Sequence, residues 1–173
     1  MPEIKVNYSL RKEEAVETIL SITKEARKKR FISICIISVF GILLTCMISG
    51  EIYSVFLFGL IALAFPGVSL FLMKRHTGKS YDETNIGKLG VELRFFRDHV
   101  EKIICADENR KSSEEIHYPF EAVKMVFESE NMYIFFISSN DIVQLPKRSL
   151  AEEDNQKIKN LIGHVFKYNF KKV

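Results

Sequence analysis

The histidines are the first residues of this sequence that could carry chemistry, as metal ligands or as general bases. His76, His99, His117 and His164 are scattered along the chain, and none stands in a metal-ligand spacing such as HExxH. A catalytic or metal site needs several titratable groups that converge, and no such set can be paired from the sequence. We therefore predict no catalytic, metal-binding or cofactor-binding residue and expect that the protein is not an enzyme.

The paired carboxylates and the cysteines do not indicate a catalytic or metal site either. Glu114 and Glu115 are expected on an exposed strand edge, and Glu152, Glu153 and Asp154 fall in the first turn of a helix, where the helix dipole favours acids. The chain has three cysteines and no CxxC pair, which is typical of structural thiols in a reducing compartment.

Lys147 and Arg148 are the candidate binding residues. In "LPKRS" they stand just before the start of a predicted helix, where backbone amides and two cations can hold an anionic lipid headgroup or a carboxylate of a partner. The simpler interpretation is that Pro146 ends a strand and that both cations are solvated.

Glu51 is an acid in the middle of a long apolar stretch, and it decides how that stretch is divided. Residues 31–49 and 52–73 contain no charge, and each is about as long as the 20 residues that a helix needs to cross a hydrocarbon core. One helix through Glu51 would be about twice the bilayer thickness. We therefore predict a transmembrane hairpin that turns at Gly50, with Glu51 in the water outside and a kink in the second span at Pro66.

Basic residues flank both predicted spans and predict their orientation. Positive flanks stay on the cytoplasmic side, so an integral plasma-membrane protein with both termini in the cytoplasm is expected. Contact with anionic lipids explains the net charge of +3, and no nucleic-acid partner is implied. The flanking basic residues are Arg27, Lys28, Lys29, Arg30, Lys74 and Arg75.

Hydrophobic periodicity indicates the elements outside the hairpin. Residues 4–10 alternate as in a half-buried strand, which we expect to join the C-terminal sheet, and an amphipathic helix follows from Arg11. About six short strands between residues 90 and 146 predict an antiparallel meander that closes into a small barrel or a sandwich. The expected parts are an N-terminal strand and helix (1–30), the hairpin (31–73), a basic linker (74–88) and a cytoplasmic domain (89–173).

The last predicted helix has a clear start and an apolar face. Ser149 and Glu152 form a capping-box pattern at its N-terminus. The apolar residues that then recur at helical spacing need a surface to cover, and the sheet is the natural one. They are Ile158, Leu161, Ile162, Val165 and Phe166.

The arrangement resembles a known bacterial family. The stretches "VELRFFRDHVEKI" and "HYPFEAVKMVFESENMYIFFISSNDIVQLPKRSL", with the helix after them, are similar to the YcxB-like family of small membrane proteins. The resemblance implies a membrane α+β fold, with two transmembrane helices and a C-terminal domain like the bacterial pleckstrin-homology (PH) kind. It implies that Phe120, after Pro119, lies in the core.

Two functions follow as expectations. The first is a non-catalytic interaction module, held at the inner leaflet, whose PH-like domain binds a protein, a peptide or an anionic lipid. The alternative is an immunity or regulatory protein whose hairpin binds a toxin or a transporter. The sequence leaves open the ligand, the process and whether the chain forms a homo-oligomer.

Overall fold

The structure is a computed structural model that describes residues 3–48, 53–84, 86–105, 113–139, 141–167 and 169–173. The chain divides into two compact units. One, which we call the sheet unit, comprises Met1–Ile22 and Gly78–Val173, and the other, the helix pair, comprises Thr23–Thr77.

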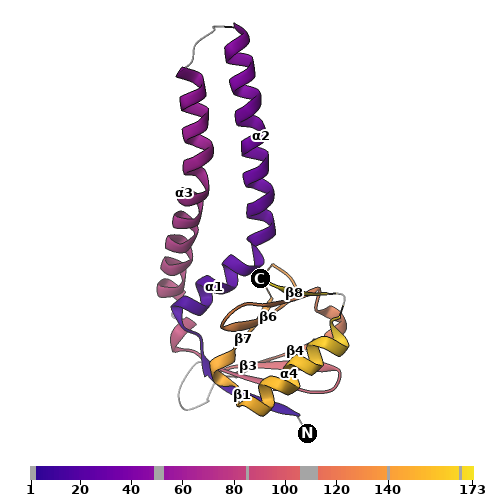
Figure 1. Ribbon diagram of the computed structural model, residues 1–173. Coiled ribbons are helices and arrows are strands. Elements are labelled where there is room, and N and C mark those ends of the chain that lie inside the picture. The colour runs from indigo at the N-terminus through magenta and orange to yellow at the C-terminus, as the bar shows by residue number, and fades with distance from the viewer. Residues whose placement is uncertain (1–2, 49–52, 85, 106–112, 140, 168) are drawn as a thin grey trace. The chain divides into compact units, whose positions relative to one another are not determined.

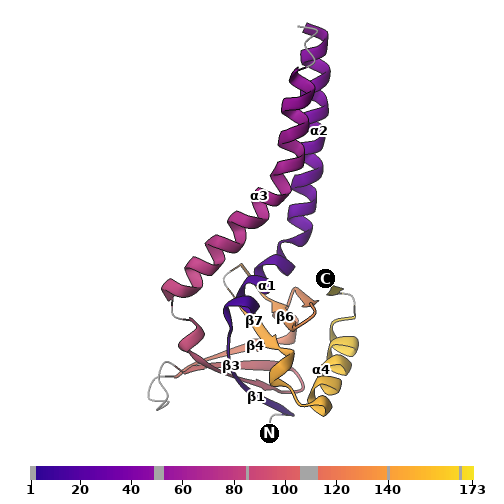
Figure 2. The same ribbon diagram turned by 60° about the vertical axis from the view of Figure 1, so that its left-hand side comes forward.

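The helix pair consists of α2 (Lys24–Ile48) and the greater part of α3 (Tyr53–Thr84). The two helices run side by side in opposite directions (Figures 1 and 2). Near mid-length a Cβ atom on Gly41 would lie 2.7 Å from the ring of Phe58, so glycine is what lets this ring approach α2. At one end Thr23 Oγ1 donates a hydrogen bond to Met73 Sδ (3.5 Å). The predicted turn at Gly50 and Glu51 lies outside the described residues.

Helix α3 is longer than the sequence predicts. It continues to Thr84, through most of the segment 74–88 that was expected to be a linker. Lys79 and Glu83 form an ion pair one turn apart (3.6 Å), and Tyr81 Oη donates a hydrogen bond to Leu10 O (2.6 Å) in the sheet unit. These contacts stabilise a helical conformation of residues 74–84, which their polar composition did not indicate. Pro66 lies inside α3.

The first sheet is an antiparallel meander in which the strands follow their order in the chain. It contains β1 (Ile4–Ser9), β2 (Gly90–Phe95), β3 (His99–Cys105) and β4 (Ser113–Pro119). The N-terminal strand pairs with β2 along its whole length, which confirms that it joins the sheet. This pairing satisfies backbone groups that a lone strand would leave exposed.

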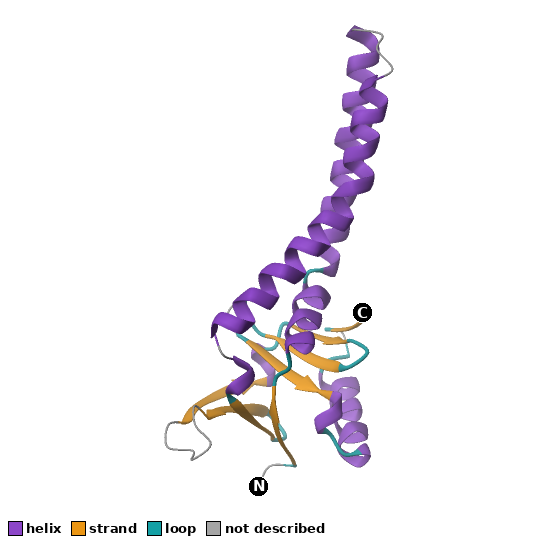
Figure 3. Ribbon diagram, turned by 90° about the vertical axis from the view of Figure 1, so that its left-hand side faces the viewer, coloured by secondary structure: helices purple, strands orange, loops and turns teal. Residues whose placement is uncertain are grey.

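The second sheet has the order β7-β6-β5-β8. It contains β5 (Met125–Glu128), β6 (Met132–Phe136), β7 (Ile142–Pro146) and β8 (Phe170–Lys172). The short strand β8, which the sequence did not predict, pairs in parallel with β5. All six strands predicted between residues 90 and 146 are present, and the orange strands of Figure 3 show their division between two sheets.

The strands do not close a barrel, because the two sheets share no hydrogen-bonded strand pair among the described strands. Side chains connect the sheets instead. Phe95 of β2 packs against Phe135 of β6 with ring centroids 5.7 Å apart, and Lys102 Nζ donates a hydrogen bond to Ile142 O (3.3 Å). Tyr8 Oη also donates to Gln144 O. Of the two predicted forms, a barrel or a sandwich, the barrel is therefore wrong, and two separate sheets enclose the core.

Helices α1 (Lys12–Ile22) and α4 (Glu152–Val165) pack onto this core. Ile158, Ile162 and Phe166 are buried as predicted, whereas Val165 is exposed. Phe166 packs edge-on against Phe120, which is itself buried as the resemblance implied.

The predicted capping box at α4 is wrong. The helix starts at Glu152 after Ala151, which makes no side-chain cap. Ser149 instead ends a short 3-10 helix, and its Oγ donates a hydrogen bond to Pro146 O (2.6 Å). The intervening turn delays the start of α4, so Ser149 is too early in the chain to cap it. Among the described residues the 3-10 helices are η1 (Ile86–Lys88), η2 (Phe120–Ala122) and η3 (Lys147–Ser149).

Candidate functional site

The first sheet has two different faces because side chains alternate along each strand. On the inner face Val6, Leu93 and Val100 are buried in the core. The opposite face, which we call the outer face, carries charged residues in neighbouring positions of β1, β2 and β3. The outer face therefore carries neighbouring charged side chains that can interact with one another or with a ligand.

A chain of ion pairs runs across the outer face. Lys5 Nζ lies 3.0 Å and Arg94 Nε 2.6 Å from Glu92 Oε1, and Arg94 Nη1 lies 3.8 Å from Glu101 Oε2. Burial raises the pKa of Glu92, but hydrogen bonds from Lys5 and Arg94 outweigh it and leave the pKa below its usual value. Glu92 is thus held as a carboxylate between two cations.

The ion pairs end at a group that we call the histidine cluster, which consists of His99, Glu101 and His117. Residues 99 and 101 are two positions apart on β3 and share a face, and Glu101 pairs directly with His117 of β4. His99 Nε2 lies 3.4 Å and His117 Nδ1 3.2 Å from Glu101 Oε1. The potential ligand atoms of the three side chains all lie within 4.8 Å of one another.

Neighbours fix the orientation of His99. Its Nδ1 lies 2.6 Å from Asp98 Oδ1, and its ring stacks on Phe96 with centroids 4.5 Å apart. The hydrogen bond with Asp98 raises the pKa of His99. Glu101 is mostly buried, while His117 is exposed. The cluster therefore combines a histidine that its neighbours hold in place, a buried carboxylate and a second histidine that is exposed to solvent.

Sequence reasoning missed this cluster. In the sequence His99 and His117 stand in no metal-ligand spacing, whereas the pairing of β3 with β4 brings them together. The intervening segment 106–112 lies outside the described residues. The only signal in the sequence was the spacing of His99 and Glu101, which places two potential ligands on one side of a strand. The other histidines, His76 and His164, are exposed on α3 and α4.

Arg148, which the sequence suggested as a binding residue, makes contacts within the chain. Its Nε and Nη2 donate to the two carboxylate oxygens of Glu14 (2.6 and 3.1 Å), and Nη2 also donates to Ser9 O (2.8 Å). The backbone amide of Arg11 donates to the same carboxylate (2.8 Å). Arg148 therefore fastens the connection between β1 and α1 to the segment after β7.

Lys147 is engaged as well. Its Nζ lies 2.9 Å from Glu128 Oε1, donates to Ser129 O (2.8 Å) and lies 4.9 Å from the centroid of the Tyr133 ring. Burial and the nearby acids raise the pKa of Tyr133 to about 12, so its hydroxyl stays protonated at neutral pH. Binding of an anionic lipid or a partner by Lys147 and Arg148 stays a prediction, in which such a ligand competes with these internal contacts.

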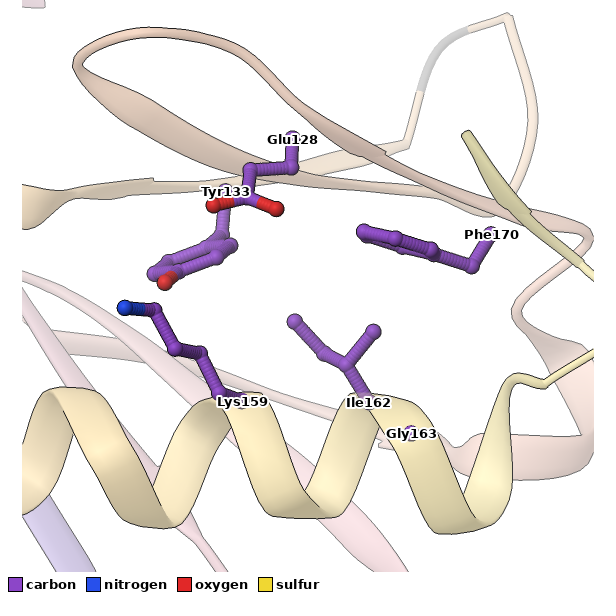
Figure 4. Close-up of a pocket in the computed structure, with 6 residues that line it drawn as sticks. All are labelled: Glu128, Tyr133, Lys159, Ile162, Gly163 and Phe170. Carbon is purple, nitrogen blue, oxygen red and sulfur yellow. The ribbon is translucent and has the colours of Figure 1, made fainter. Parts of the chain in front are cut away.

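A small cavity lies between α4 and the second sheet, with Glu128 and Lys159 at its edge (Figure 4). Tyr133, Ile162 and Phe170 line it, and its volume is about 200 Å³. Pockets that hold small-molecule ligands are roughly 300–1,000 Å³, so this cavity is below the usual size. Gly163 borders it, and a Cβ atom there would meet nothing within 4 Å.

The basic residues that flank the apolar segments lie in the helix pair. Arg27, Lys28, Lys29 and Arg30 are in the first turns of α2, and Lys74 and Arg75 follow Met73 in α3. The hydrogen bond between Thr23 and Met73 brings these two parts of the helices together, so both basic groups occupy the same end of the pair.

Both helices of the pair are long and apolar enough to cross a membrane. Only 6% of the apolar window in α2 and 0% of that in α3 is buried, unlike the core helix of a soluble protein. These features define a class of protein with two helices of membrane-spanning length and a two-sheet unit.

The family comparison agrees with the resemblance seen in the sequence. Residues 103–162 match the family model of YcxB-like proteins. This segment runs from β3 into α4 and includes His117, Lys147 and Arg148. No curated protein matches the chain.

Proposed function

We propose that this protein is a non-catalytic interaction module anchored in the plasma membrane. In this proposal α2 and α3 span the bilayer, both termini are cytoplasmic, and the sheet unit is a PH-like domain that binds a protein, a peptide or an anionic lipid. The observation that carries the proposal is the exposure of large apolar side chains along the whole helix pair.

The exposed apolar surface supports the anchor. Met47 and Leu63 expose 85% and 84% of their surface, and Phe56 exposes 73%. A soluble protein rarely leaves a continuous apolar surface of this kind in water, whereas lipid tails accommodate it without cost.

The basic residues support the orientation. Arg30 and Lys74 belong to groups at one end of the helix pair, and the positive-inside rule assigns that end to the cytoplasm. Because Thr23 and Thr77 bound the helix pair, both connections to the sheet unit leave from this end. The sheet unit would then be cytoplasmic.

Labelling of a single cysteine tests the orientation. Glu153→Cys places a thiol on the exposed side of α4, in a variant in which the three native cysteines have been replaced by serine. A membrane-impermeant maleimide should label it in broken cells and not in intact cells. Labelling in intact cells would contradict the cytoplasmic assignment.

Photo-crosslinking of the full-length protein in its native membrane tests which region binds the partner. A photoreactive amino acid at Glu115, which is exposed on β4, samples the outer face, and one at Leu60, which is 67% exposed on α3, samples the helix pair. The proposal predicts a specific adduct, protein or lipid, from position 115.

The alternative function gives the opposite result. An immunity or regulatory protein that uses its hairpin would yield a protein adduct from position 60 and none from position 115. A probe at Glu153, in the first turn of α4 shortly after Arg148, samples the surface beside the candidate binding residues Lys147 and Arg148.

A further inference from the structure

Two of the ligand spacings in the histidine cluster, those from Glu101 to each histidine, are close to those of a tetrahedral metal site. Zinc lies about 2.0–2.1 Å from imidazole nitrogen and 2.0–2.2 Å from carboxylate oxygen, so neighbouring ligand atoms are about 3.3–3.6 Å apart. The distances from Glu101 Oε1 to His99 Nε2 and His117 Nδ1 are 3.4 and 3.2 Å. The nitrogens of the two histidines lie within 4.8 Å of each other, so a rotation of the exposed His117 ring toward His99 would place one ion among the three atoms.

The surroundings orient each ligand as metal sites require. Asp98 accepts a hydrogen bond from Nδ1 of His99, so Nε2, which faces Glu101, is the nitrogen that can bind an ion when it carries no proton. Arg94 approaches Oε2 of Glu101 (3.8 Å), so Oε1 is left for an ion. Carboxylate–histidine pairs and held carboxylates of this kind fix the tautomer and the ring orientation of metal ligands.

We propose that His99, Glu101 and His117 bind a divalent transition-metal ion of the Zn²⁺ class. Two imidazoles and one carboxylate suit Zn²⁺ better than Ca²⁺ or Mg²⁺, which prefer all-oxygen sites. Three protein ligands leave a fourth position open, and the exposed side of His117 provides access to it. The site goes beyond the proposed anchoring function and does not depend on it.

The charge around the cluster is compatible with a bound cation. Each group of the outer-face network is paired, and the carboxylates of Glu92, Glu101 and Asp98 outnumber the cations of Lys5 and Arg94. The competing arrangement is one in which protons occupy the imidazole nitrogens and form ordinary ion pairs with Glu101. The two arrangements differ in metal affinity, which is directly measurable.

Calorimetric titration with Zn²⁺ tests the proposal on tag-free, full-length protein in detergent micelles. The wild-type chain should bind about one Zn²⁺, as expected for a site with a single set of three ligands. His117→Ala should remove this binding, and because His117 is exposed, its removal leaves the core intact. His164→Ala, an exposed histidine on α4, is the matched control and should bind as the wild type does.

Asp98→Asn tests the positioning of His99. Loss of such an outer partner typically weakens metal binding about 10-fold or more, and Asp98 is exposed, so the unfolding temperature of the metal-free chain should not change. Co²⁺ gives a second readout, since a tetrahedral site produces visible absorption bands that His117→Ala should abolish.

Two results overturn the proposal. The first is a wild-type chain without a saturable Zn²⁺ site. The second is equal affinity in the wild type, His117→Ala and His164→Ala, which would place the ion elsewhere on the chain.

Discussion

The helix pair and the sheet unit use large apolar side chains in opposite ways. In the sheet unit Leu93 and Phe135 are completely buried, and the core extends over both sheets and α4. In the helix pair Met47 and Leu63 are almost completely exposed. The same residue types therefore serve one unit in which water is excluded by packing and another that needs an apolar solvent around it.

Truncation of a core aromatic side chain should have the largest effect on stability, and it tests whether the two units differ in how they use apolar side chains. Phe135→Ala removes a ring that packs against Phe95 and Phe166, and it should lower the free energy of unfolding of the sheet unit by about 3–5 kcal/mol. Phe56→Ala, at an exposed position of α3, is the matched control and should leave this free energy unchanged.

The chain has no tryptophan, so chemical unfolding of the detergent-solubilised protein is best followed by circular dichroism of the strands. Equal losses of stability in the two variants would show that the helix pair is packed as the sheet unit is, and the comparison would fail.

A charge in the middle of α3 should have the next largest effect. Leu63→Arg places a cation where the proposed span lies in hydrocarbon, at a cost of about 2.5–3.5 kcal/mol. We expect a larger fraction of the protein to be extracted from membranes by alkaline carbonate. His76→Arg, in the basic flank of the same helix, should remain in the membrane fraction. Unchanged retention of both variants would argue against insertion of α3.

The smallest expected effect concerns the buried carboxylate of Glu14. Glu14→Gln leaves Arg148 without its charged partner, although Arg148 retains Ser9 O, and we expect a loss of about 1–3 kcal/mol in thermal or chemical unfolding. The matched control is Arg97→Ala, which removes an exposed pair with Glu3 and should cost about 0–1 kcal/mol. If both variants lose the same stability, the contact of Arg148 is no more than a surface ion pair.

Much of the local structure was predictable because it depends on residues that are near one another in the chain. Alternation identified β1 and β2, and the uninterrupted apolar run of β6 is typical of a strand that is buried on both faces, as Tyr133 and Ile134 are. The helical part of 74–88 was missed because part of its support, the hydrogen bond from Tyr81 to Leu10, comes from a residue that is remote in sequence. The predicted cap at Ser149 was wrong because a 3-10 helix intervenes before α4.

The histidine cluster was less predictable for the same reason. His99 and Glu101 are near neighbours, but the third member comes from β4, and only the register of β3 against β4 places His117 opposite Glu101. A shift of one residue would turn His117 to the inner face. A site assembled across strands therefore has no fixed spacing in the sequence.

The sequence by itself determined the two apolar helices, the strands between residues 90 and 146 and the apolar stripe of α4, because hydrophobic periodicity and length act locally. Only the tertiary structure decided that Arg148 pairs with Glu14, that β8 joins β5 in parallel and that His99, Glu101 and His117 meet. These contacts join segments far apart in the chain, and their geometry is set by the packing of the whole core and by strand register.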